Sequence, residues 1–355
     1  MDEMDKLKNF WRGKKIFITG NTGFKGSWLS LIMLNLGAEV KGFSLKPEKD
    51  KSLYAKLKLE DNSNNIYGDI RNEKLLTDEL RSFNPEIVFH MAAQPLVRRS
   101  YIDPLETIST NVVGTFNVMQ ACRSVESIKS VISVTTDKCY LNKEWEYSYR
   151  ENDNLGGHDP YSASKACAEI ITSSMRDSFF KDRETGISTV RAGNVIGGGD
   201  FSEDRLFPDI IKSIVKKEEL IIRNPLATRP WQHVLEPLFA YIELAKNQYN
   251  SPKNFSSAWN VGPDAQNAKS VGFILDKINF LYSDLVNWKN SENDEPHEAQ
   301  LLQLDSSKFK NKNVWIPKWD LSETIKITMD WYISDLEGVN ALKLCEEDIK
   351  KYLAK

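Results

Sequence analysis

The chain has 355 residues, of which 41% are hydrophobic and 27% are charged, as in ordinary folded globular proteins. Its 47 basic and 50 acidic residues give a formal net charge of −3, which argues against nucleic acid or an anionic membrane as the main partner. No apolar run approaches the roughly 20 residues that a membrane span requires. The 4 cysteines are scattered and show no metal-ligand spacing. These features predict a cytoplasmic protein without a disulfide framework or a metal site.

In the first half of the chain, short apolar runs alternate with segments of helical spacing. Strands are predicted at 15–19, 39–44, 66–67, 86–89, 130–135 and 187–191, and helices at 24–36, 72–83, 104–123 and 159–180. This alternation predicts an α/β fold with a Rossmann-like, doubly wound parallel sheet that helices cover on both faces.

The residue pattern of the sequence changes after Arg191. Glycines cluster at 197–199, charged loops lengthen, and helices are predicted at 207–217, 234–247 and 271–282. We therefore expect a Rossmann-like domain in residues 1–192. A smaller lobe, mainly substrate-binding, is expected in residues 193–355, with some of its segments returning to the first domain.

A glycine-rich turn joins the first predicted strand to the first predicted helix: Gly20-Asn21-Thr22-Gly23-Phe24-Lys25-Gly26. Glycines permit a tight turn, and backbone amides at the start of a helix can approach a pyrophosphate. The spacing is G-x-x-G-x-x-G rather than the usual G-x-G-x-x-G, so a purely structural turn is the alternative. Dinucleotide binding is the stronger interpretation, and its candidate residues are Gly20, Thr22, Gly23, Phe24, Lys25 and Gly26.

The second strand ends without the Asp or Glu that commonly binds the adenosine ribose of NAD. Ser44 can hydrogen-bond the ribose instead, and Lys46 can meet a 2′-phosphate, so the choice between NAD and NADP stays open. Asp69 and Ile70 follow the third strand, where the adenine is expected. For Asp69, a helix cap before Asn72 is an equal alternative.

Two acid/base pairs indicate the chemistry. Tyr161 and Lys165 lie one helical turn apart on a shared face, where a phenol can take a proton from a hydroxyl during hydride transfer. Asp137 and Lys138 add a carboxylate and an amine after a predicted strand. A plain alcohol dehydrogenase does not need this second pair, whereas an enzyme that breaks C–H and C–O bonds does. His90 also ends a strand, but a core role is expected for it.

Six blocks carry a family resemblance: 20–28 (GNTGFKGSW), 90–98 (HMAAQPLVR), 135–140 (TTDKCY), 155–162 (LGGHDPYS), 191–200 (RAGNVIGGGD) and 229–237 (RPWQHVLEP). With them the chain resembles the extended short-chain dehydrogenase/reductase superfamily and, within it, the CDP-glucose 4,6-dehydratases. The last hundred residues match less sharply. One departure is Asn21, where this branch usually has histidine. Little consequence is expected, because the turn is lined by backbone.

The resemblance implies a role for each member of the two pairs. Tyr161 would take the proton of the C4 hydroxyl, Thr136 would bind the same oxygen, and Lys165 would lower the pKa of Tyr161 and hold the nicotinamide ribose. Asp137 would protonate the leaving C6 hydroxyl. Lys138 would take the C5 proton, for which its pKa must be depressed. Alternatively, Lys138 positions a water or a ribose while another group moves the proton.

The resemblance also implies NAD as the cofactor and a nucleotide sugar, CDP-glucose or a similar one, as the substrate. Further cofactor contacts are expected from Ala92, Ala93, Gln94 and Thr135. Substrate contacts are expected from Ser100 at the hexose, Asn194 at the sugar or diphosphate, Arg229 and, less firmly, Arg205 at the diphosphate, and Trp231 and His233 at the nucleotide wall. A surface salt bridge is the alternative for Arg205, and core packing is the alternative for Trp231 and His233.

The expected reaction is conversion of CDP-glucose to CDP-4-keto-6-deoxyglucose, in a pathway that makes deoxysugars for surface polysaccharide such as lipopolysaccharide O-antigen. A nucleotide-sugar 4-epimerase, a dehydratase of another nucleotide sugar and a non-enzymatic dinucleotide-binding protein are the alternatives. A homodimer or homotetramer is expected, paired through the helices predicted at 104–123 and 159–180.

Overall fold

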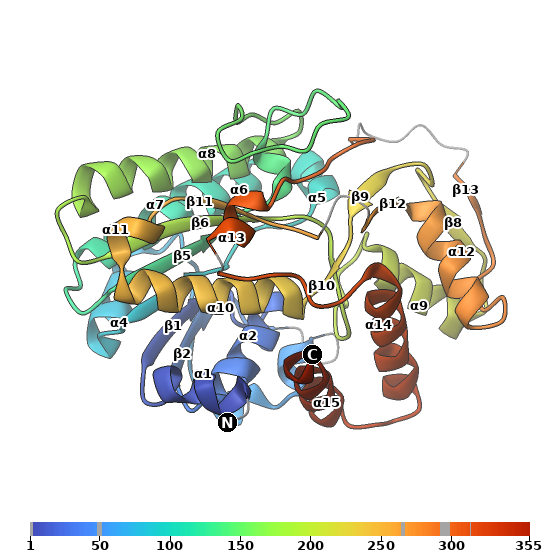
Figure 1. The fold of residues 1–355 in the computed structure, drawn as a ribbon, viewed down its shortest axis with the longest axis horizontal. Coiled ribbons are helices and arrows are strands. Elements are labelled where there is room, and N and C mark those ends of the chain that lie inside the picture. The colour runs from blue at the N-terminus through green and yellow to red at the C-terminus, as the bar shows by residue number, and fades with distance from the viewer. Residues whose placement is uncertain (1–2, 48–51, 264–266, 292–298, 313) are drawn as a thin grey trace.

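The computed structural model describes residues 3–47, 52–263, 267–291, 299–312 and 314–355 (Figure 1). Its centre is a seven-stranded sheet in which every pairing is parallel. The strand order is β11 (Ala258–Val261), β6 (Gly186–Ala192), β5 (Ser130–Val134), β4 (Ile87–His90), β1 (Lys15–Thr19), β2 (Glu39–Ser44) and β3 (Asn64–Tyr67). The chain reverses its direction of winding between β1 and β4, and ligands of such sheets bind beyond the carboxyl ends of the strands at this point.

Helices cover both faces of the sheet, because the strands are apolar on both sides. Ile16 and Ile18 of β1 pack in one core cluster with α2 (Phe24–Asn35) and α10 (Leu235–Asn250). Phe17, between them, belongs to the opposite cluster with α4 (Glu73–Phe83) and α7 (Gly114–Arg123). This alternation is the period of two that a strand imposes on its side chains. It confirms the doubly wound parallel sheet.

The remaining elements surround this sheet. The helices are α1 (Glu3–Trp11), α3 (Leu53–Lys56), α5 (Val97–Ile102), α6 (Pro104–Ile108), α8 (Pro160–Met175), α9 (Leu206–Lys216), α11 (Pro252–Phe255), α12 (Val271–Leu281), α13 (Ser307–Asn311), α14 (Leu321–Leu336) and α15 (Ala341–Ala354). The short turns are η1 (Leu59–Asp61), η2 (Ser109–Val113), η3 (Asp137–Cys139) and η4 (Arg176–Phe180). Three small sheets pair β7 (Val195–Ile196) with β10 (Gln232–His233), β9 (Thr228–Pro230) with β12 (Ala268–Ser270), and β8 (Leu220–Ile222) with β13 (Trp288–Asn290).

The predicted elements of the first half are present with shifted ends. The strands at 15–19 and 39–44 have the expected bounds, whereas the helix predicted at 104–123 is α6, the π-turn η2 and α7 in succession. The helix α5 was not predicted. Strand β11 joins the sheet from the C-terminal part of the chain, beside β6. None of the helices in the described ranges is long and apolar enough to span a membrane.

Candidate active site

The glycine turn forms a cradle that side chains would fill. Gly20 has a φ of +75°, and a Cβ on it would lie 2.6 Å from the amide nitrogen of Ala92. A Cβ on Gly26 would lie only 2.1 Å from the carbonyl oxygen of Gly20. Helix α2 begins within this turn, at Phe24, and its N-cap Gly23 provides no capping side chain. Its first amides therefore suit an anion, and the turn fits the pyrophosphate of a dinucleotide.

Asn21 has a larger role than the sequence suggested. Its side chain is fully buried rather than facing the turn. Its Nδ2 donates to Asn65 Oδ1 at 2.7 Å, and its Oδ1 accepts from Ser44 Oγ at 2.8 Å. Ser44 Oγ also lies 3.0 Å from Thr22 Oγ1. The expectation that the identity of residue 21 has little consequence was thus wrong, because Asn21 connects the turn to β2 and β3 through buried hydrogen bonds.

The residues expected at the adenosine are already hydrogen-bonded within the chain. Asp69 accepts from the backbone amide of Arg71 at 2.8 Å and from its guanidinium at 2.6 Å. These hydrogen bonds from Arg71 lower the pKa of Asp69. The cap alternative for Asp69 is wrong, since Asn72 itself caps α4 by accepting from Leu75 N. Ile70 is buried in the core. Ser44 is buried, so its hydroxyl would have to share its present partners with a ribose.

The loop after β4 is held by its own polar side chains. The amide nitrogens of Met91 and Ala92 donate to Thr19 Oγ1 at 3.2 and 3.3 Å. The buried Gln94 donates from Nε2 to Thr107 Oγ1 at 2.8 Å, and its backbone amide donates to Asn111 Oδ1 at 2.8 Å. Ala93 is half-buried in the same loop. The loop thus has a fixed path along the carboxyl edge of the sheet.

The carboxyl end of β5 and the start of α8 bring the two acid/base pairs together. Tyr161 is buried at the start of α8, and burial raises its pKa to about 12. A hydrogen bond with Thr136 and the charge of Arg205 lower this pKa, while Asp137 and Asp159 raise it. Tyr161, Thr136 and Asp137 therefore interact directly, as the sequence predicted.

Asp137 is 2% exposed and begins η3. Its Oδ1 accepts from Thr136 Oγ1 at 3.0 Å, whereas its buried Oδ2 has no hydrogen-bond partner among the described residues. Lys138 follows it in η3, is half-buried, and donates from its backbone amide to Thr136 Oγ1 at 3.3 Å. A buried carboxylate oxygen without a partner is costly unless a ligand occupies it.

Lys165 is buried one turn after Tyr161 and donates to the carbonyl oxygen of Val134 at 3.2 Å. Burial lowers its pKa to about 8. The groups that lower the pKa of Tyr161 are Thr136 and Arg205. The pKa of Lys25 is also lowered to about 8, by burial and by the charges of Arg205 and Lys165. The side chain of Lys25 therefore reaches the same site.

The substrate candidates differ in their surroundings. Arg205 donates to the carbonyl oxygen of Pro95 at 3.2 Å. The neighbouring Asp204 pairs with Arg98 and Arg223, each at 3.1 Å. Arg229 is 3% exposed and donates to the carbonyl oxygens of Thr228 and Gln300.

The other four candidates range from half-buried to fully buried. Asn194 is half-buried between β6 and β7. Ser100 is fully buried, and its hydroxyl donates to the carbonyl oxygen of Val97 at 2.6 Å. Trp231 is also buried and donates to the carbonyl oxygen of Lys269 at 2.8 Å.

His233 lies in the core. It is fully buried, with its ring 4.8 Å from that of Trp319 and 6.3 Å from that of Trp28. Burial lowers its pKa to about 3. This packing corrects the wall position that we expected for His233 and favours the core alternative. His90 is a core residue too, as predicted, since it is bonded to Thr19 and Thr115.

Comparison with known proteins assigns the family. The family model described as GDP-mannose 4,6 dehydratase matches residues 17–328. The chain belongs to this family. It is 47% identical to a CDP-glucose 4,6-dehydratase of Salmonella typhimurium over 98% of each chain. It is 25% identical to a dTDP-glucose 4,6-dehydratase of Xanthomonas campestris, covering 92% of this chain and 95% of the relative.

A solved structure has the same fold as this member of the GDP-mannose 4,6 dehydratase family. A Bacillus cereus UDP-glucuronic acid 4-epimerase, in complex with UDP-glucuronic acid and NAD, superimposes with a TM-score of 0.77 at 23% identity. The match covers 91% of this chain and 99% of the epimerase. At this identity the likeness establishes the shared architecture, and activity has to be argued from the residues of the site.

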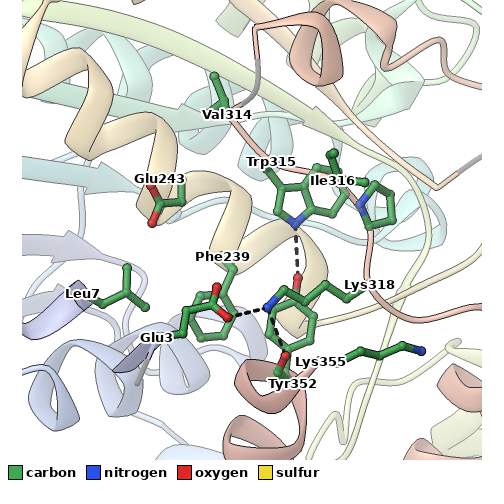
Figure 2. A pocket seen from close by; sticks show the side chains of 11 residues that line it. Glu3, Leu7, Phe239, Glu243, Val314, Trp315, Ile316, Lys318, Tyr352 and Lys355 are labelled. Atoms are coloured by element: carbon green, nitrogen blue, oxygen red, sulfur yellow. Dashed lines mark hydrogen bonds and ion pairs between the residues drawn. The ribbon is translucent and has the colours of Figure 1, made fainter. Parts of the chain in front are cut away.

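A separate hollow lies away from these residues (Figure 2). Its volume is about 500 Å³, and its walls come from α1, α10, α15 and the segment 314–318. The Lys318 ammonium bridges the Glu3 carboxylate at 2.9 Å and the Tyr352 carbonyl oxygen at 3.3 Å across it. None of the candidate catalytic, cofactor or substrate residues lines this hollow.

Sequence reasoning missed three polar residues beneath the site. Asn111, in the π-turn η2, donates to Gln94 O and to Ser164 Oγ and so joins the β4 loop to α8. Glu169 and Arg191 form a buried ion pair at 2.8 Å. Glu169 stands four residues after Lys165 on the same helical face, which is a usable signal. Nothing in the spacing of Asn111 or Arg191 marks them, because their partners are distant in sequence.

Proposed function

We propose that this chain is an NAD-dependent nucleotide-sugar 4,6-dehydratase, a lyase that converts CDP-glucose to CDP-4-keto-6-deoxyglucose. The observation that carries the proposal is Asp137. Its buried Oδ2 has no hydrogen-bond partner among the described residues, Lys138 follows it in the chain, and Thr136 links it to Tyr161. A second acid/base pair at the oxidising tyrosine is what an elimination requires. The similarity to a protein named CDP-glucose 4,6-dehydratase supports the choice of nucleotide.

NAD is the cofactor in this proposal, and the glycine cradle fits its pyrophosphate. When bound, NAD would accept a hydride from C4 of the hexose and return it to C6. Gly20, Thr22, Gly23, Phe24, Lys25 and Gly26 would hold the pyrophosphate, Ser44, Asp69 and Ile70 the adenosine, and Ala92, Ala93, Gln94, Thr135, Tyr161 and Lys165 the nicotinamide half.

Tyr161 takes the C4 hydroxyl proton in the first step. It can do so only as the phenolate, although burial raises its pKa to about 12. The positive charges nearby, Arg205 among them, favour the phenolate. Thr136 donates to the same substrate oxygen and keeps it beside the phenol. Lys165 holds the nicotinamide ribose.

Asp137 and Lys138 act in the elimination. Oxidation at C4 acidifies the C5 proton. Neutral Lys138 takes this proton, and protonated Asp137 gives one to O6, so that water leaves from C6. The final proton returns to C5. Burial lowers the pKa of two other lysines, Lys25 and Lys165, to about 8, and Lys138 needs a lowered pKa to act as the base.

Arg229 and Arg205 bind the substrate diphosphate, since guanidinium groups pair well with phosphate oxygens. Asn194 binds the sugar or the diphosphate, Ser100 approaches the hexose, and Trp231 borders the nucleotide. Replacing Arg229 by methionine should raise the KM for CDP-glucose with a smaller effect on kcat, and an unchanged KM would remove Arg229 from the diphosphate site.

The direct test is incubation of the protein with CDP-glucose and a small amount of NAD. A 4-keto-6-deoxy product supports the proposal, and turnover of another nucleotide sugar alone would change the substrate and keep the reaction. A nucleotide-sugar 4-epimerase is the second candidate, favoured by the shared fold and by Tyr161 and Lys165. Asp137→Asn separates the two: it should stop water elimination in a dehydratase and leave epimerisation nearly unchanged.

We also propose a cytoplasmic homodimer or homotetramer that serves deoxysugar synthesis. The free cysteines fit a reducing compartment. Large apolar side chains are exposed on the helices of one side of the sheet, where Figure 1 shows α5 to α8 together: Ile102, Leu105, Val113, Phe116 and Ile170. Such a patch favours a protein interface. Light scattering should give a multiple of 40.6 kDa, and Leu105→Glu should shift it toward the monomer mass.

A further inference from the structure

The short segment that carries Asp137 and Lys138 is anchored at both ends by one buried ion pair. At its start, Thr135 Oγ1 donates to Glu169 Oε1 at 2.5 Å. At its end, Arg191 NH1 donates to the Tyr140 hydroxyl at 2.8 Å. Glu169 Oε2 and Arg191 NH2 are in turn 2.8 Å apart. The two anchors are thus joined beneath η3.

The ion pair is deeply buried. Glu169 and Arg191 are each 3% exposed. Burial works against the charged guanidinium, but the Glu169 carboxylate raises the pKa of Arg191 above its ordinary value. Buried ion pairs contribute little net stability compared with apolar residues of similar volume. Their value lies in fixing one geometry, and here that geometry is the path of residues 135–140.

The frame around the pair is rigid. Thr189 Oγ1 of β6 donates to Glu169 Oε2 at 2.7 Å, and the Tyr140 hydroxyl donates to Asn260 Oδ1 of β11 at 2.6 Å. Glu169 belongs to α8. Three elements of the core therefore hold the two ends of η3, and Asp137 and Lys138 lie between these ends.

We propose that Glu169 and Arg191 are positioning residues that clamp residues 135–140 and so fix Asp137 and Lys138 for elimination. The inference rests on the proposed function for its chemistry. Tyr161 is placed by α8 itself, so the Arg191 end of the clamp serves the elimination pair rather than the oxidising tyrosine. Loss of the Arg191–Tyr140 contact should therefore slow water elimination while C4 oxidation continues.

The experiment compares Tyr140→Phe with a matched control, Tyr149→Phe. Tyr149 is a buried tyrosine whose ring stacks on that of Tyr140 at 5.1 Å. Its hydroxyl bonds to Asn142 and to the Lys143 amide rather than to Arg191. Single-turnover reactions with CDP-glucose give two rates. Absorbance of the reduced cofactor measures C4 oxidation, and the amount of 6-deoxy product measures the steps that follow.

Tyr140→Phe should slow formation of the 6-deoxy product by about tenfold to a hundredfold. This is the usual cost of misplacing a catalytic group by a fraction of an ångström to one ångström. C4 oxidation should stay near the wild-type rate, so that reduced cofactor accumulates. Tyr149→Phe should leave both steps near wild type. At the other end, Thr135→Val should loosen the same segment and Thr135→Ser should restore it by keeping the hydroxyl, and both are read by amide exchange because Thr135 is also assigned to the nicotinamide half of NAD.

Amide hydrogen exchange supplies a readout that does not depend on activity. Exchange of the peptide covering 135–140 should be faster in Tyr140→Phe and Thr135→Val than in wild type, and unchanged in Tyr149→Phe. The clamp is overturned if exchange there stays at wild-type rates, or if both reaction steps fall together in Tyr140→Phe. Faster exchange in a protein that does not turn over CDP-glucose would support the clamp and overturn the proposed function instead.

Discussion

Replacing Gly26 by alanine should distort the dinucleotide turn. The new Cβ would lie 2.1 Å from the carbonyl oxygen of Gly20 and 2.7 Å from Cα of Asn21, both backbone atoms that have no rotamer to adopt. The first turn of α2 must then move away by about 1 Å to restore ordinary contact, and such overpacking costs about 1–3 kcal/mol. With an unfolding entropy of about 2.1 cal/mol/K per residue, this corresponds to a Tm lower by roughly 1–4 °C.

The same movement displaces the amides that face the pyrophosphate. NAD at about one hundred times its Kd should stabilise the wild type by about 2.7 kcal/mol, and this increase in Tm should vanish in Gly26→Ala. Thermal unfolding with and without NAD measures both effects. Gly23→Ala is the stability control, since its Cβ would stay 3.4 Å from Gly20 O. A Gly26→Ala protein with the wild-type Tm and an intact response to NAD would refute the reasoning.

Three further predictions concern charge. Asp137→Asn should abolish release of the 6-deoxy product while C4 oxidation continues, measured as reduced cofactor in a single turnover; loss of both would assign Asp137 a different role. Arg205→Met should move the alkaline rise of C4 oxidation to higher pH, because Arg205 lowers the pKa of Tyr161; an unmoved profile would exclude that influence. Burial raises the pKa of Glu236 to about 7, so ionised Glu236 destabilises the fold and stability should rise as pH falls from about 7 to 4.5. Glu236→Gln should remove this dependence of up to about 1.4 kcal/mol per pH unit in chemical denaturation, and identical pH slopes would contradict it.

The strands and helices of the sheet were predictable because their signals are local. The apolar run at 15–19 and the glycines after it predict a strand followed by a turn, and Pro104 after Asp103 marks a helix start that ends α5. Strand β11 was missed because it has four residues, one of them the buried Asn260. Its place beside β6 depends on pairing across the chain. Helices α1, α14 and α15 were likewise omitted. For α1 the apolar signal is weak, since its buried residues are only Leu7 and Trp11.

The residues of the site differ in the same way between those with a local sequence signal and those that depend on contacts across the chain. Tyr161, Lys165, Thr136 and Asp137 were predicted from short motifs, and the structure brings them together. The residues beneath them were not predicted, because the partners of Glu169 lie on β6 and directly after β5 and become neighbours only in the folded sheet. The buried position of His233 shows the same limit of motif reading: a motif places a residue near a site without stating which way its side chain points.

The most direct test of the account follows the fate of the C4 hydrogen. CDP-glucose deuterated at C4 is incubated with the protein and a small amount of NAD in ordinary water, and the product is analysed by NMR. The account predicts CDP-4-keto-6-deoxyglucose with the deuterium at C6. A C4 epimer that retains the deuterium at C4 would contradict it, as would a 4-keto product that still carries its C6 hydroxyl.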